Sequence, residues 1–246
     1  MRSLLIFSIT LVIISSIITS QLIQSENEIT TYIENSVPYV GTEIPRTDGM
    51  DGTGIIIAII DTGVDFNHPD LFGWGLDGKV IGGYNFIQPD ELPMDTNGHG
   101  TKVAGVIAAD GNTFGVAPKA KILAYKVSED GEGVSSELIS GAIQKAIEDE
   151  ADIINISLGV NRTNSKIDNA VNHALDNGIF VVTAAGNDGP ELETIGSPGR
   201  NLQSLTVGAT YNNMTSSLIA TLQIDEKQYT VIPMVGSSKT SEPITG

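Results

Sequence analysis

Residues 54–63 read GIIIAIIDTG, and this stretch decides what kind of sheet the chain builds. Five isoleucines and one alanine run from Ile55 to Ile60 without a polar interruption and then give way to Asp61. β-Branched residues favour strands, and an unbroken apolar run is typical of a strand buried on both faces. Such strands belong to parallel sheets that helices cover on each side. We therefore expect Ile55–Ile60 to be a central strand of an α/β sheet.

Similar apolar runs alternate with helical patterns along the rest of the chain. Further strands are expected at Lys79–Phe86, Lys121–Val127, Ile153–Ile156, Ile179–Ala184 and Ser204–Val207. Between them, Val134–Asp149 and Ser165–Asn177 carry apolar residues at i, i+3 and i+4 spacing, which predicts amphipathic helices. This alternation predicts a mostly parallel sheet with helices on both faces. In such sheets the active site lies outside the carboxyl ends of the strands.

The composition excludes several kinds of site and partner. The 246 residues include 13 basic and 30 acidic side chains, and a net charge of −17 argues against nucleic acid as a partner because phosphate would be repelled. Cysteine is absent from the sequence, which excludes disulfides, thiol nucleophiles and thiolate metal sites. The three histidines are His68, His99 and His173. Carboxylates, hydroxyls, amides and at most one or two imidazoles must therefore supply the chemistry.

The first 50 residues are expected to precede the main domain. Residues 1–20 carry one charge, Arg2, followed by an apolar run, which is typical of a secretory signal peptide. The uncharged stretch is also compatible with an uncleaved anchor, so residues 4–23 are a candidate membrane tether. Either interpretation predicts an extracellular or cell-surface protein. Residues 21–50 are polar and are expected to be a lead-in or a short pro-segment.

Three polar groups follow the expected strands or open the helix between them. Asp61 ends an apolar run, and a carboxylate there is costly unless it has a hydrogen-bonded or charged partner. His99 lies between Gly98 and Gly100 at a helix start, which would keep the imidazole neutral and able to accept a proton, and the glycines would leave room for another chain to approach. Asn187 follows the strand at 179–184 and could donate to developing negative charge.

Each of these residues also has a simpler interpretation. Asp61 alone could be a turn or cap residue, and Asn187 before Asp-Gly is a common turn former. His99 alone could be an ordinary loop histidine. The order of the three residues along the chain and the sequence motifs around them decide between these alternatives.

Five sequence motifs, taken together, resemble those of one protein family. They are IIDTGVDFNHPDL (59–71), NGHGTKVAGVIAA (97–109), GVAPKAKILAYKV (115–127), INISLG (154–159) and VVTAAGNDGP (181–190). In this order they resemble the subtilisin-like serine proteases, the subtilases or peptidase S8 family. The resemblance covers roughly residues 50–210 and implies a subtilisin-like three-layer α/β fold. Residues 51–210 are therefore expected to be a partial peptidase domain.

The resemblance assigns roles to individual positions. Asp61 matches the triad aspartate, His99 the general base and Asn187 the amide donor to the oxyanion. Two segments match the strands that bind the substrate backbone by β-augmentation, and two residues match the wall of the pocket for the side chain before the scissile bond. These segments are Ser157, Leu158 and Gly159, and Gly131, Glu132 and Gly133; the pocket residues are Ala185 and Gly186.

The resemblance also bears on metal ions and partners. Asp70 falls where many family members place a calcium ligand, although the loop Ala109–Gly115 lacks the residues that usually complete that site. A structural calcium ion at Asp70 is thus an expectation, and no cofactor is required for the chemistry. Polypeptide substrates and a monomeric protein are expected.

The family's nucleophile lies in Gly-Thr-Ser-Met-Ala at the start of a helix, and no such string occurs in the sequence. The serines after Asn187, none of which fits the nucleophile, are Ser197, Ser204, Ser216, Ser217, Ser237, Ser238 and Ser241. We therefore expect a C-terminally truncated domain that is inactive alone. Residues 211–246 look β-rich and resemble the start of the protease-associated insertion that some subtilases carry before the serine.

Two alternatives to an endopeptidase remain open. A pseudo-protease would keep the cleft and lose the nucleophile, and would act as a peptide-binding or inhibitory module. A hydrolase that uses Asp61 and His99 on a bound metal is less favoured, because two such ligands are too few for a zinc site.

Overall fold

The computed structural model describes residues 36–89, 91–131, 134–189, 192–209, 220–224 and 227–231. The predicted signal or anchor at residues 1–20 lies outside the described residues, as does the first half of the predicted lead-in. The chain divides into two units, one ending at Gly208 and one beginning at Ala209, and each is described by itself. Among the described residues, no helix is long and apolar enough to cross a membrane.

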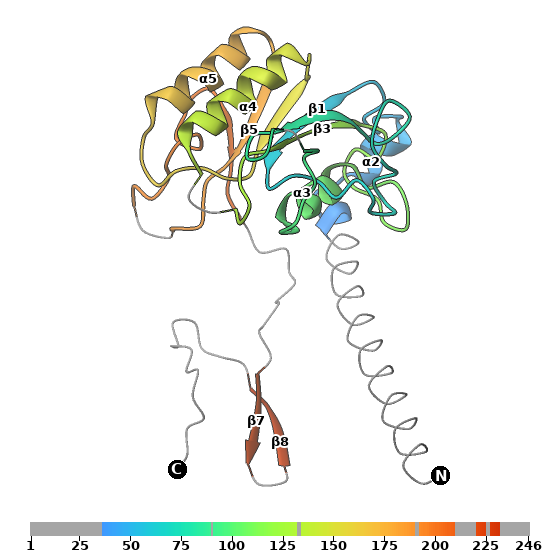
Figure 1. Cartoon of the computed structure of the whole chain (residues 1–246). Helices are drawn as coiled ribbons and strands as arrows, with labels where there is room; N and C mark the ends of the chain where they lie inside the picture. Colours follow the sequence, from blue (N-terminus) through green and yellow to red (C-terminus); the bar gives the residue numbers. More distant parts are fainter. Residues whose placement is uncertain are drawn as a thin grey trace, which may run out of the picture. The chain divides into compact units, whose positions relative to one another are not determined.

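The first unit is built on a six-stranded sheet in which all neighbouring strands are parallel (Figure 1). The strands are β1 (Ile56–Asp61), β2 (Val80–Asn85), β3 (Lys121–Lys126), β4 (Ile153–Ile156), β5 (Phe180–Ala184) and β6 (Leu205–Val207), and the helices are α2 (Glu43–Thr47), α3 (His99–Ala108), α4 (Ser136–Glu148) and α5 (Ser165–Asp176). The α/β fold predicted from the sequence is confirmed.

β1 contributes side chains to two separate cores. Ala58 and Ile60 pack into the core that contains the buried residues of α4 and α5. Ile57 and Ile59 pack into the core that contains those of α3. Successive side chains of a strand point to opposite faces, so the next residue, Asp61, belongs to the α3 face. The apolar run is continuous because both faces of this strand are covered (Figure 1).

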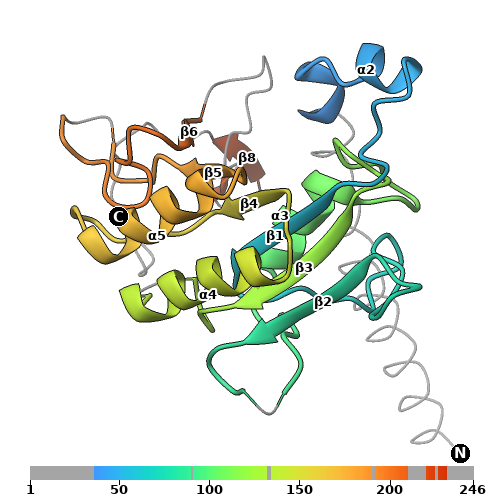
Figure 2. The ribbon, with the colours of Figure 1, turned by 90° about the horizontal axis from the view of Figure 1, so that it is seen from above.

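The strand order β2-β3-β1-β4-β5-β6 puts β1 in the interior of the sheet, between β3 and β4 (Figure 2). The chain leaves β1 toward one side and later returns to pair β4 on the other side. Ligands of open α/β sheets bind at the carboxyl ends of the strands where the order reverses in this way. Asp61 ends β1 at that point and is matched with Lys126 at the end of β3.

The helices α3, α4 and α5 begin differently. The side chain of Ser135 caps α4 by accepting from the Glu137 N–H, and Asn164 caps α5 in the same manner. α3 is preceded by Gly98 in the left-handed conformation, with φ of 99°, and has no such side-chain cap. Its first N–H groups find partners elsewhere: the His99 and Thr101 N–H groups donate to Asn97 and Asp95 in the preceding turn, and the Gly100 N–H donates to Thr62, which follows β1.

The described part of the second unit is an antiparallel hairpin of β7 (Ala220–Ile224) and β8 (Lys227–Val231). Its identity as the start of an inserted module stays a prediction.

Candidate active site

Asp61 and His99 form a hydrogen-bonded pair at the carboxyl end of β1. His99 Nδ1 lies 2.7 Å from Asp61 Oδ1. The Asp61 side chain is fully buried, whereas the His99 side chain is 48% exposed. A carboxylate partner assigns the proton to Nδ1, so Nε2 of the neutral ring is left as the proton acceptor. The pair therefore has the arrangement of a general base held in one tautomer by a buried carboxylate.

The Asp61 carboxylate is held in an unfavourable environment. Burial raises its pKa above the ordinary value, and the hydrogen bonds from His99 and from the Thr62 N–H only partly oppose this effect. Oδ1 accepts both of these bonds, while the buried Oδ2 has no hydrogen-bond partner. A positive charge that develops on His99 during proton transfer would compensate this buried negative charge.

Gly100 permits the close approach of α3 to the end of β1. A Cβ atom at this position would lie 2.1 Å from the Gly63 carbonyl oxygen and 3.1 Å from Asp61 Oδ1. The sequence suggested that the glycines around His99 make room for another chain. At Gly100 that space is filled by the turn that follows β1 in this same chain, so the expectation that another chain approaches here was wrong. At Gly98, by contrast, a Cβ atom would have no atom within 4 Å beyond those of its chain neighbours.

Asp95, which the sequence analysis did not single out, organises the turn before His99. Its Oδ1 accepts from the Asn97 and Gly98 N–H groups and from the Thr62 hydroxyl, each at 2.9 Å. Its Oδ2 accepts from the N–H and the hydroxyl of Thr101 at 2.8 and 2.6 Å. Burial alone would raise the pKa of Asp95, but these hydrogen bonds together outweigh it and hold the pKa below its ordinary value.

Thr62 extends this arrangement to the helix. Its hydroxyl donates to Asp95 and accepts from the Gly100 N–H at 3.0 Å. The first turn of α3 is thus capped by side chains from the preceding turn and from Thr62, which directly follows β1, rather than by its own N-cap residue. This network fixes where His99 stands relative to Asp61.

Of the predicted substrate-binding residues, Gly131 is the one that the structure ties to this network. A Cβ atom at Gly131 would lie 3.8 Å from Thr62 Cγ2, so this segment passes beside the end of β1. The Gly131 N–H donates to Ser128 Oγ at 2.9 Å, and φ of 83° suits a glycine. Glu132 and Gly133 lie outside the described residues.

The other predicted substrate residues follow β4 and β5. Ser157 accepts from Asn155 Nδ2 at 2.9 Å, Leu158 is buried and Gly159 is exposed. After β5, the Ala185 N–H donates to the Val207 carbonyl, and Gly186 is exposed with φ of 93°. Their roles in substrate binding stay predictions.

Asn187 is exposed in the turn after β5. In the part of the chain that the structure describes, no hydrogen bond joins it to Asp61 or His99. The His99 ring is hydrogen-bonded to Asp61, and the His99 backbone N–H donates to Asn97. Among the residues that the structure describes, no serine hydroxyl is hydrogen-bonded to His99. The oxyanion role of Asn187 is therefore a prediction from the sequence.

Both carboxylate oxygens of Asp70, the candidate calcium ligand, already accept hydrogen bonds from the protein. Its Oδ1 accepts from the Asn112 N–H at 2.6 Å, and its Oδ2 accepts from the Thr113 hydroxyl at 2.8 Å and from the Thr113 N–H at 3.3 Å. A Cβ at Gly111 would lie 2.3 Å from Oδ1. Calcium needs six to eight oxygen ligands, and no cluster of three acidic or histidine side chains occurs among the described residues. The group around Asp70 does not fit the ion.

Comparison with known proteins shows to which family this chain belongs. The model of the subtilase family matches residues 52–240. The chain belongs to the subtilase family. The match includes β1, α3 and the strands that follow, so the fold and the buried pair lie within the matched residues.

Individual subtilases are similar over most of this chain. The minor extracellular protease Vpr of Bacillus subtilis (strain 168) is 38% identical over 200 residues, which are 76% of this chain and 24% of that protein. Thermitase of Thermoactinomyces vulgaris is 39% identical over 178 residues, 71% of this chain and 61% of thermitase. The major intracellular serine protease of B. subtilis (strain 168) is 40% identical over 173 residues, covering 65% and 52%. The chain thus spans between a quarter and three fifths of these subtilases, whose names include both extracellular and intracellular proteins.

Proposed function

We propose that this subtilase is a serine endopeptidase that hydrolyses polypeptides through an Asp-His-Ser triad. The observation that carries the proposal is the 2.7 Å bond from His99 Nδ1 to the buried Asp61, together with the 48% exposure of the His99 side chain. This is the geometry that a general base needs, and it stands at the carboxyl end of the central strand.

The proposed mechanism gives each group one task. His99 Nε2 removes the proton from a serine hydroxyl as that oxygen attacks the substrate carbonyl, and later returns the proton to the leaving amine. Asp61 keeps the ring in the correct tautomer and compensates the charge that develops on it. Asn187 donates to the oxyanion. The serine is proposed to lie outside the described residues, in agreement with the absence of the family's serine string from the sequence.

The proposal extends to substrates and setting. The substrate backbone is proposed to pair with the segments at Gly131 and at Ser157–Gly159, which add it to the sheet as a strand. We further propose that the protein is a monomer and is exported or tethered through residues 4–23. The second half of the predicted lead-in, residues 36–50, packs against the folded unit, because Val37 is buried and Arg46 donates to the Gly115 carbonyl.

The test compares two histidine variants of the intact gene product, in which any coding sequence following residue 246 is retained. His99→Ala should lower kcat for casein or a peptide substrate by roughly four orders of magnitude, because the general base is lost. His173→Ala is the matched control, since that histidine lies in the last turn of α5. It should retain the activity of the unmodified protein.

A fluorophosphonate probe separates the protease from the pseudo-protease. The probe should label one serine of the intact gene product, and His99→Ala should slow the labelling. Equal labelling rates for the two proteins would contradict the assignment of His99. An absence of both labelling and hydrolysis, with retained peptide binding, would favour the pseudo-protease.

A further inference from the structure

Lys126 is a buried cation at the end of β3 that the proposed mechanism does not use. Only 3% of its side chain is exposed. Its Nζ lies 2.8 Å from Glu129 Oε2 and donates to the Met94 carbonyl at 3.1 Å and the Thr96 hydroxyl at 3.3 Å. A buried ammonium group is costly unless it is paired and hydrogen-bonded, so these three contacts define where it can be accommodated.

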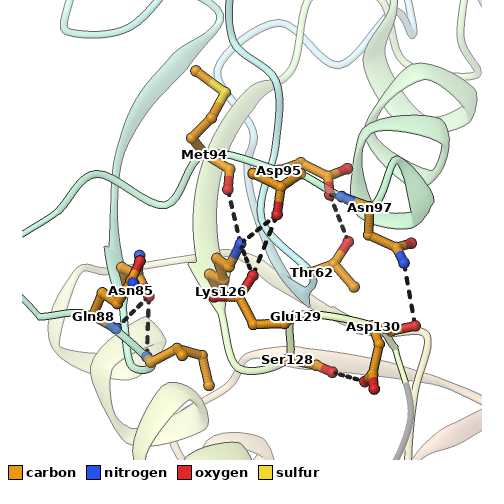
Figure 3. A network of polar contacts seen from close by, with 12 residues as sticks. Thr62, Asn85, Gln88, Met94, Asp95, Asn97, Lys126, Ser128, Glu129 and Asp130 are labelled. Atoms are coloured by element: carbon orange, nitrogen blue, oxygen red, sulfur yellow. Dashed lines mark hydrogen bonds and ion pairs between the residues drawn. The ribbon is translucent and has the colours of Figure 1, made fainter.

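The partners of Lys126 belong to two different segments. Met94 and Thr96 lie in the turn that leads into His99, and Glu129 lies in the segment that leads to Gly131. Figure 3 shows the ammonium group between Met94 and Glu129. Lys126 therefore joins the turn that carries the general base to the segment predicted to bind the substrate backbone.

Two further contacts run between the same segments. The Thr96 hydroxyl donates to Glu129 Oε2 at 3.3 Å. The Asn97 side-chain amide donates to the Asp130 carbonyl at 3.3 Å, as Figure 3 shows. Both are exposed, whereas the Lys126 side chain is only 3% exposed and its hydrogen bonds to Met94 and Thr96 are part-buried. The lysine is consequently the central member of the connection.

The two segments that Lys126 joins are each hydrogen-bonded to a functional residue, His99 on one side and Gly131 on the other. On one side, Asn97 Oδ1 accepts from the His99 N–H at 3.1 Å. On the other, Ser128 Oγ accepts from the Gly131 N–H at 2.9 Å. Among the described residues, Lys126 itself makes no hydrogen bond to Asp61 or His99, so its effect on them would be indirect.

We propose that Lys126 is a positioning residue that holds the turn that leads into His99 and the segment that leads to Gly131 at a fixed separation. A substrate strand bound along Gly131 then meets the imidazole without a prior rearrangement of either segment. The proposal rests on the proposed function for its catalytic meaning, but the connection between the two segments is testable without any turnover.

The first test measures amide hydrogen exchange in the 246-residue chain. Lys126→Met keeps an unbranched side chain that is one atom shorter and removes its charge. The amides of His99 and Gly131 should exchange at least tenfold faster in this variant, while amides of α5 keep their rates. The matched control is Lys79→Met, because Lys79 is also buried, lies just before β2 at the opposite end of the sheet, and donates to the Pro118 carbonyl.

The second readout is the proton of His99 Nδ1, which reports on the bond to Asp61 in NMR spectra. Lys126→Met should broaden or shift this signal, and Lys79→Met should leave it in place. Glu129→Gln is a milder variant that retains the buried ammonium and weakens its ion pair. It should raise the exchange rate of Gly131 by a smaller factor, and it serves as the decisive variant if Lys126→Met does not fold.

Kinetics of the intact gene product complete the test. Lys126→Met should raise KM for an extended peptide and lower kcat/KM by ten- to a hundredfold, with Lys79→Met within twofold of the unmodified enzyme. Equal effects of the two lysine variants on exchange and on the His99 signal would overturn the positioning role. If the unmodified gene product has no peptidase activity, the proposed function fails, while the exchange result still decides whether Lys126 joins the two segments.

Discussion

Asp61 shows that the site is built at the expense of stability. One carboxylate oxygen accepts two hydrogen bonds and the other accepts none, although the whole side chain is buried. A charged group in this position destabilises the folded state unless its partner is also charged. Catalytic groups are often held in such environments because the same features that cost stability make them reactive.

The substitution Asp61→Asn should stabilise the protein at neutral pH, because it removes the buried charge and keeps a side chain of the same shape. The gain is expected to be on the order of 1 kcal/mol. The pKa of Asp61 is raised in the folded state, so the charge destabilises that state as pH rises above the ordinary value of 3.8 and through the folded pKa. The gain should therefore vanish in acid.

Urea unfolding between pH 3 and pH 8 measures this difference. Asp188→Asn, which changes an exposed carboxylate in the turn after β5, should follow the unmodified protein at every pH. A gain for Asp61→Asn that is independent of pH would show that ionisation of Asp61 is not its cause.

The sequence predicted the buried pair but missed the residues that hold it. Asp61 stood out because it ends an apolar run, and the flanking strings connected it with His99. Lys126 carries the same signal, since it lies between Tyr125 and Val127 in an apolar strand. Asp95 carries no such signal, because Asp-Thr-Asn-Gly is ordinary turn sequence and its partner Thr62 is 33 positions away.

At the scale of the elements, α3 differs from the other helices in how it begins. α4 and α5 carry their own N-cap side chains, and their starts could be predicted from the sequence to within two residues. α3 depends on Asp95 and Thr62 for the same hydrogen bonds. Its first turn is thus coupled to β1, and the coupling rests on contacts between distant segments that local patterns do not reveal.

Asp95→Ala should therefore destabilise the protein more than loss of a conventional cap. Five hydrogen bonds to a buried carboxylate would be lost, at a cost of about 2 to 4 kcal/mol. Ser135→Ala, which removes the cap of α4, should cost about 1 kcal/mol. Chemical denaturation of both variants measures the contrast, and similar losses would argue against the capping role of Asp95.

At the scale of the whole molecule, the net charge of −17 opposes folding through repulsion between acidic groups. Salt screens such repulsion, so raising NaCl from roughly 0.05 to 1 M should increase Tm by several degrees. CaCl2 at matched ionic strength should follow a similar curve, since the oxygens of Asp70 are occupied by the loop 110–113. A distinctly steeper rise with calcium would show that a specific calcium site exists.

The alternation along β1 has a consequence for how this protein can evolve. Even-numbered residues face α4 and α5, odd-numbered ones face α3, and Asp61 inherits the second direction. Inserting or deleting a single codon within this strand would reverse that parity, exchange the occupants of the two interiors and turn the carboxylate away from the imidazole. Related proteins can lengthen or shorten the surface loops around the site. Within the six residues of β1, however, an insertion or deletion of an odd number of residues would not be tolerated.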